Sequence, residues 1–104
     1  MNRDTAPPAP PKSLSARYRD GQILLNWDEN TEPDLDGYNV FRATTPGTGY
    51  IQVAAGIVSN RCVFRADDPG AIYHYVVTAR DQRGNESRFS SEATVHLPRQ
   101  PSRP

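Results

Sequence analysis

The strongest alternation of apolar and polar residues lies in residues 71–79, which read Ala-Ile-Tyr-His-Tyr-Val-Val-Thr-Ala. Every second residue from Tyr73 to Ala79 is aromatic or apolar, and the intervening residues, from His74 onward, would face the other way. A period of two in a stretch rich in aromatic and β-branched residues indicates a β-strand with one buried face. Turn signals at residues 68–70 and 81–85 bound this stretch. We therefore place the strand at the centre of a sheet.

Six other stretches share the period of two, for example residues 22–27, where Ile23, Leu25 and Trp27 fall on one side. A helix would need apolar residues three and four positions apart, and no stretch of the sequence offers that spacing. Strands are predicted at residues 12–19, 22–27, 37–43, 50–54, 61–65, 71–79 and 91–97. Seven short strands separated by turns predict an all-β chain of two packed antiparallel sheets. The predicted core contains Trp27, Tyr38, Tyr73, Tyr75 and Val77.

Length and charge narrow the classes of function. The 104 residues suit one domain, and the 12 basic residues balance the 12 acidic ones. A chain without net charge has no overall field that would recruit nucleic acid or an anionic membrane surface. No apolar run is long enough to span a bilayer, and residues 1–4 do not begin a signal peptide, because no apolar segment follows them. A single cysteine permits no internal disulfide.

Both ends of the chain are rich in proline. Residues 5–11 contain four prolines, and residues 98–104 contain three. Such stretches favour extended polyproline II conformation and act as semi-rigid spacers. We expect linkers at residues 1–11 and 98–104 around one domain at residues 12–97, and the alternative is that both ends are simply disordered.

Several motifs in order resemble a fibronectin type III domain. They are the paired prolines before the first strand, Trp27 in the second, residues 33–42 (Pro-Asp-Leu-Asp-Gly-Tyr-Asn-Val-Phe-Arg) and residues 69–79. The sequence most resembles the bacterial variety found as repeats in secreted polysaccharide-degrading enzymes, and residues 81–87 are similar to the loop after the sixth strand in that group. The resemblance implies a seven-stranded antiparallel immunoglobulin-like β-sandwich, a non-catalytic role and an extracellular location.

The resemblance also implies roles for single residues. Trp27 would be the buried tryptophan of the second strand. Tyr73 would form a tyrosine corner, in which its hydroxyl bonds to the backbone a few residues upstream. The family usually has an apolar residue six positions before this tyrosine, where the present chain has Asp67. Either the crossover is remodelled, or Asp67 faces water and Ile72 or Ala66 covers the gap.

The sequence offers little catalytic or metal-binding chemistry. Five carboxylates fall within residues 28–36, which could bind calcium, but Pro33 interrupts them and a solvated loop is the favoured interpretation. His74 and His96 are predicted on outward strand positions, and Cys62 on the core side, so the three do not converge on a zinc ion. We expect no catalytic residue, no metal and no cofactor.

Two further features concern recognition. Residues 83–85 (Arg-Gly-Asn) are similar to an integrin-binding Arg-Gly-Asp tripeptide but lack its carboxylate, so a turn with positive φ explains them better. Phe41, Tyr50 and Phe89 have no clear core position and could form a platform on which sugar rings stack. The alternative is that they pack under loops and cover sheet edges.

Two classes of function remain. The first is a non-catalytic accessory or spacer module of a larger extracellular protein, such as a polysaccharide-degrading enzyme. In this class the module is a monomer whose partners are the neighbouring domains. The second is a module that binds polysaccharide or a protein through Phe41, Tyr50, Phe89 and the loops. Coplanar, exposed rings would favour the second class.

Overall fold

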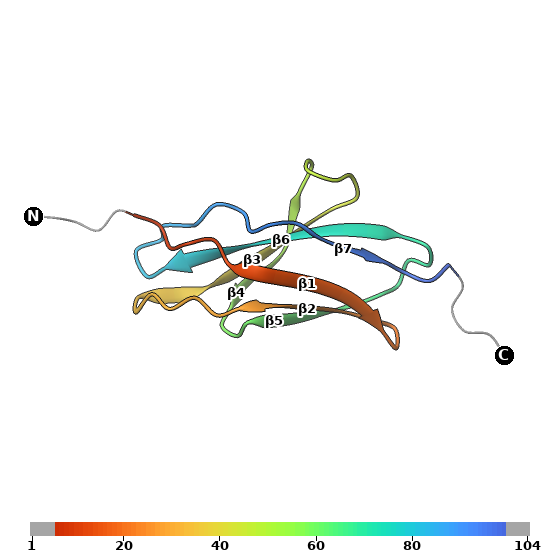
Figure 1. Cartoon of the computed structure of the whole chain (residues 1–104), viewed down its shortest axis with the longest axis horizontal. Coiled ribbons are helices and arrows are strands. Elements are labelled where there is room, and N and C mark those ends of the chain that lie inside the picture. Colours follow the sequence, from red (N-terminus) through yellow and green to blue (C-terminus); the bar gives the residue numbers. More distant parts are fainter. Residues whose placement is uncertain (1–5, 100–104) are drawn as a thin grey trace, which may run out of the picture.

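The computed structural model describes residues 6–99, which form two antiparallel sheets packed face to face (Figure 1). One sheet has the strand order β1-β2-β5 and the other has the order β4-β3-β6-β7. The strands are β1 (Lys12–Arg19), β2 (Gln22–Asp28), β3 (Leu35–Ala43), β4 (Ile51–Ile57), β5 (Arg61–Arg65), β6 (Ile72–Asp81) and β7 (Ala93–His96). The prediction of an all-β, seven-stranded sandwich is confirmed. Within residues 6–99 no helix is long and apolar enough to cross a membrane.

The core lies between the two sheets and is built from alternate residues of the central strands. Trp27 on β2 meets Tyr38 on β3 edge to face, with ring centroids 5.1 Å apart. Phe64 on β5 stacks on Tyr75 of β6 at 5.7 Å and an interplanar angle of 13°. Trp27, Tyr38, Tyr73, Tyr75 and Val77 are all buried. Aromatic pairs that join opposite sheets in this way hold the two layers together.

The prediction that β6 buries only one face is wrong, because His74, Val76 and Thr78 on the outer face are also buried. The chain after β6 explains this burial. Residues 86–92 run beside the second half of β6, where the backbone amides of Ser87 and Ser90 donate to the carbonyls of Ala79 and Val77. Side chains of the same segment then cover the outer face. His74 is therefore not the surface histidine that its position in the alternation predicts, whereas His96 is exposed.

Within residues 6–99, the hydrogen bond of the Tyr73 hydroxyl goes to a side chain and not, as a tyrosine corner would require, to the backbone. The hydroxyl donates to Oδ2 of Asp68 over 2.5 Å. This hydrogen bond, together with burial, raises the pKa of Tyr73. Asp67 faces water beside Arg65, and Ala66 packs against the core. Ile72, the other candidate for covering the gap, is exposed.

The chain before β1 is part of the folded domain. Pro8 and Pro11 are buried, and Ala9 between them is hydrogen-bonded through both its backbone groups to the β2–β3 loop. Residues 8–11, which were predicted as part of a linker, therefore pack against the sandwich. Residues 1–5 and 100–104 of the expected linkers lie outside the described residues.

Candidate functional site

The three aromatic residues singled out from the sequence meet on the outer face of the β4-β3-β6-β7 sheet. The ring centroid of Phe89 lies 5.2 Å from that of Phe41 and 5.1 Å from that of Tyr50. Phe89 is 47 % exposed, and the other two rings are half-buried. The interplanar angles are 58° and 64°, so the rings form a contiguous cluster without sharing a plane. We call these three residues the aromatic cluster.

Different elements position the members of the aromatic cluster. Phe41 lies on β3 opposite Val76 of β6, on the face that the core does not occupy. Phe89 comes from the segment that runs beside β6. Tyr50 precedes β4, and its hydroxyl donates to Oε1 of Glu92. The cluster therefore joins β3, the segment beside β6 and the loop before β4.

Glu92 organises the polar side of the aromatic cluster. Besides Tyr50, its Oε1 accepts the backbone amide of Gly47 at 2.9 Å, and its Oε2 lies 3.4 Å from Nδ1 of His74. The Tyr50 hydrogen bond, and to a lesser degree the Gly47 bond, lower the pKa of Glu92. Burial and the same hydrogen bond raise the pKa of Tyr50. The Tyr50 ring is thus fixed by a carboxylate that stays ionised at neutral pH.

A depression of about 490 Å³ opens beside Phe41 and Phe89. Glu86 and Arg88 stand on its border, and both are exposed. The Oε2 atom of Glu86 accepts the Thr78 hydroxyl at 2.5 Å and the Asn39 side-chain amide at 3.2 Å. The depression therefore has a mainly apolar surface, with an oriented carboxylate and an arginine residue at its border.

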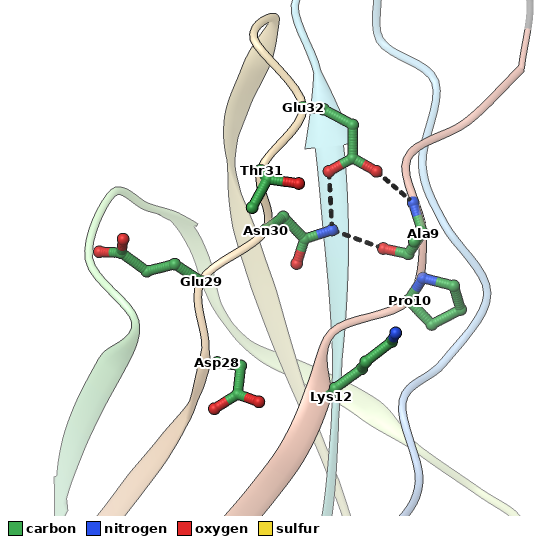
Figure 2. A pocket seen from close by; sticks show the side chains of 8 residues that line it. All are labelled: Ala9, Pro10, Lys12, Asp28, Glu29, Asn30, Thr31 and Glu32. Atoms are coloured by element: carbon green, nitrogen blue, oxygen red, sulfur yellow. Dashed lines mark hydrogen bonds between the residues drawn. The ribbon is translucent and has the colours of Figure 1, made fainter.

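A second hollow, of about 220 Å³, lies where the chain enters the sandwich, between residues 9–12 and the β2–β3 loop (Figure 2). The Ala9 amide donates to Oε2 of Glu32 over 2.8 Å, and the Asn30 side chain donates both to the Ala9 carbonyl at 2.7 Å and to Oε1 of Glu32 at 3.1 Å. The Ala9 hydrogen bond lowers the pKa of Glu32, against a smaller effect of burial. We call Ala9, Asn30 and Glu32 the N-terminal clip.

The loop after β6 is held by Asp81 and has the turn that residues 83–85 predict. One Asp81 oxygen accepts the backbone amides of Arg83 and Asn85, both at 2.9 Å, and the other accepts the Asn85 side chain at 3.0 Å. Gly84 has a φ of +89°. Burial alone would raise the pKa of Asp81, but these hydrogen bonds together lower it. Residues 83–85 thus form a closed turn that is centred on the Asp81 carboxylate.

Among residues 6–99, no group of three or more histidine, cysteine, aspartate or glutamate side chains is placed to hold a metal ion. Cys62 is a half-buried free thiol whose pKa is raised by burial, which suits a small apolar side chain. Of the five carboxylates at residues 28–36, Glu32 belongs to the N-terminal clip and Asp36 lies 3.9 Å from Arg80. The acidic stretch is therefore divided among separate local contacts.

Sequence reasoning identified the aromatic cluster but missed the residues that orient it. Glu86 lies outside every predicted strand, and Glu92 is a polar position of the strand predicted at residues 91–97. Only the path of residues 86–92 beside β6 brings both carboxylates to the outer face. Asn30 and Glu32 were grouped by charge with their neighbours in the acidic stretch. Their contact with Ala9 spans more than 20 residues of sequence, so no local pattern signals it.

The sequence profile of the fibronectin type III domain matches residues 9–96. The chain belongs to this family. The match begins at Ala9 of the N-terminal clip, in agreement with the packing of residues 8–11 against the sandwich.

Solved structures show the same fibronectin type III architecture. A Fn3-like protein from Clostridium thermocellum has a TM-score of 0.77 and 32 % identity, with 91 % of this chain and 98 % of that chain covered. A beta-1,2-glucanase from Parabacteroides distasonis has a TM-score of 0.75 and 26 % identity, and covers 93 % of this chain but 13 % of the glucanase. The same unit thus occurs inside a much longer enzyme.

Curated relatives are also long enzymes that contain a similar segment. The domain is 28 % identical over 99 residues to an amylopullulanase of Thermoanaerobacterium saccharolyticum, and 30 % identical over 89 residues to one of Thermoanaerobacter thermohydrosulfuricus. The matches cover 95 % and 86 % of this chain but 8 % and 6 % of the two enzymes. The domain therefore spans less than a tenth of the length of the curated relatives that it matches.

Proposed function

We propose that this fibronectin type III domain is a non-catalytic spacer module of a larger extracellular enzyme that acts on carbohydrate. Its partners are the domains before and after it in the parent chain, which it holds at a set distance and direction as a monomer. The relatives support this proposal, because they are long enzymes in which the matched segment is a small part. Their name refers to amylose and pullulan, so we take glucose polymers as the carbohydrate class.

The observation that carries the proposal is that the described chain enters and leaves at opposite ends of the sandwich, and each end is fixed (Figure 1). At the entry, the N-terminal clip holds Ala9. At the exit, the Gly70 amide donates to the Pro98 carbonyl at 2.7 Å, and the Leu97 amide donates to the Ala71 carbonyl at 2.8 Å. A domain with fixed ends at opposite poles transmits orientation, whereas one with loose ends would set only a maximum distance.

The contribution of the N-terminal clip to stability depends on pH. Because the folded-state pKa of Glu32 is below its ordinary value of 4.5, the clip contributes fully above that value. Its contribution is lost as the pH falls through the lowered pKa. The entry joint is therefore rigid at neutral pH and loosens only in acid.

Replacing Glu32 by alanine tests the entry joint. We expect hydrogen exchange of the Ala9 amide at neutral pH to accelerate by about tenfold, because its carboxylate acceptor is gone. Exchange of the core amides of β6 should stay unchanged. NMR-detected exchange on the intact 104-residue chain is the measurement.

Glu29→Ala is the matched control, because Glu29 lies on the same loop and its carboxylate points away from Ala9 (Figure 2). Unaltered exchange at Ala9 in the Glu32 variant would contradict the fixed joint. Equal acceleration in both variants would contradict it as well, because the effect would then come from the loop's total charge.

Binding through the aromatic cluster is the second candidate function. The rings that would form the site do lie together, and one of them is exposed. They do not share a plane, so the geometry does not favour a platform for a flat, insoluble polysaccharide.

A further inference from the structure

We propose that the aromatic cluster and the depression beside it bind a soluble glucose polymer whose chain coils, such as an α-1,4-linked glucan. The inference takes its ligand class, a glucose polymer, from the proposed function and adds a binding site to it. The spacer role does not depend on this site.

The angles between the aromatic rings favour a coiled α-1,4-linked glucan over a flat β-1,4-linked one. Sugars place the apolar faces of their rings on aromatic side chains, and a flat β-1,4-linked chain therefore needs aromatic rings in one plane. Here Phe41 and Tyr50 are inclined by 58° and 64° to Phe89. An α-1,4-linked chain turns from one sugar to the next, so successive sugar faces meet rings that are inclined to one another.

The depression supplies apolar surface with polar side chains at its edge. The depression is open and mainly apolar, so it would contact one side of a bound chain. Arg88, whose side chain can donate hydrogen bonds, and Glu86, whose carboxylate can accept them, lie at its border. Glu86 is already oriented by Thr78 and Asn39, so little conformational freedom is lost when a hydroxyl binds.

Charge complementarity favours a neutral ligand. One guanidinium group and one carboxylate border the depression, so their charges cancel. An anionic polysaccharide or a nucleic acid would gain no net attraction there, whereas sugar hydroxyls both donate and accept hydrogen bonds. The Tyr50 ring lies beyond the depression and is held by its hydrogen bond to Glu92. The ordered aromatic surface is therefore long enough to contact more than one sugar unit.

NMR titration of the intact chain with maltoheptaose, an α-1,4-linked glucose oligomer, tests the site, and cellopentaose serves as the β-1,4-linked comparison. We expect shift changes at Phe41, Arg88 and Phe89 with maltoheptaose, and affinity for cellopentaose at least about tenfold lower. Phe89→Ala should weaken maltoheptaose binding by about tenfold or more, because it removes the exposed ring. Arg88→Ala should also weaken it while leaving every ring in place.

Val63→Ala is the matched control, because Val63 is 49 % exposed on the opposite sheet. It should leave the affinity unchanged. No shift change with maltoheptaose, changes confined to another face, or equal affinity for both oligomers would each overturn the proposal. None of these results would bear on hydrogen exchange at Ala9, so failure of the sugar site and failure of the spacer role are distinguishable.

Discussion

Replacing Trp27 by alanine should lower the free energy of unfolding by about 3–5 kcal/mol, which approaches the whole stability of a domain of this size. Trp27 is 2 % exposed and packs against Tyr38 of the facing sheet. Removal of the indole leaves a cavity between two sheets that β-ladders keep from closing over it. Urea unfolding followed by circular dichroism measures the loss, and a large part of the variant should be unfolded without urea.

The conservative variant Trp27→Phe separates volume from hydrogen bonding. The indole N–H has no hydrogen-bond partner within residues 6–99. Phenylalanine therefore loses ring area but no hydrogen bond in that part of the chain, and should cost clearly less than alanine. Equal destabilisation by the two substitutions would show that the position does more than fill the space between the sheets.

The domain should lose stability as the pH rises through the range from 10 to 12. Burial raises the pKa of Tyr75 from 10.0 to about 12, against a smaller opposite effect of Arg42. Because the folded state holds this proton more tightly than the unfolded state, the contribution is complete below pH 10 and is lost as the pH approaches the folded-state value. We expect a loss of about 1–3 kcal/mol, which is the scale that a shift of two pKa units sets.

Tyr75→Phe is the control for the alkaline transition. It keeps the ring that stacks on Phe64 and removes the ionising hydroxyl. Urea titrations at a series of pH values should show a smaller alkaline loss in this variant than in the wild type. The raised pKa values of Tyr50 and Tyr73 act in the same direction, so part of the loss should remain. An identical alkaline slope in both proteins would contradict the assignment to Tyr75.

The strands and the core could be predicted because they depend on local alternation. Ile23, Leu25 and Trp27 reveal their shared face within six residues of sequence, and the structure buries all three. The second buried face of β6 could not be predicted in this way. Its burial depends on residues 86–92, which lie beside β6 only after the chain has turned back. The alternation of residues within β6 does not predict that covering segment.

Contacts between side chains and backbone groups that are distant in the sequence could not be predicted either. Proline content alone made residues 8–11 look like a linker, because nothing in the prolines shows that Glu32 accepts the Ala9 amide. The partner of Tyr73 was misjudged for a related reason. A side-chain carboxylate one residue past Asp67 replaces the backbone acceptor, and both kinds of partner satisfy the hydroxyl. The aromatic cluster was anticipated as a set of residues but not in its geometry.

We propose that the folded unit includes both of its ends, so that the domain fixes the direction of the chain on either side. Backbone 15N relaxation of the intact protein tests it most directly. We predict order parameters of about 0.85 at Ala9 and Leu97, equal to those of the central strand β6. Order parameters below about 0.6 at Ala9, with β6 remaining rigid, would contradict the proposal. The domain would then be joined to its neighbour by a flexible segment that sets no direction.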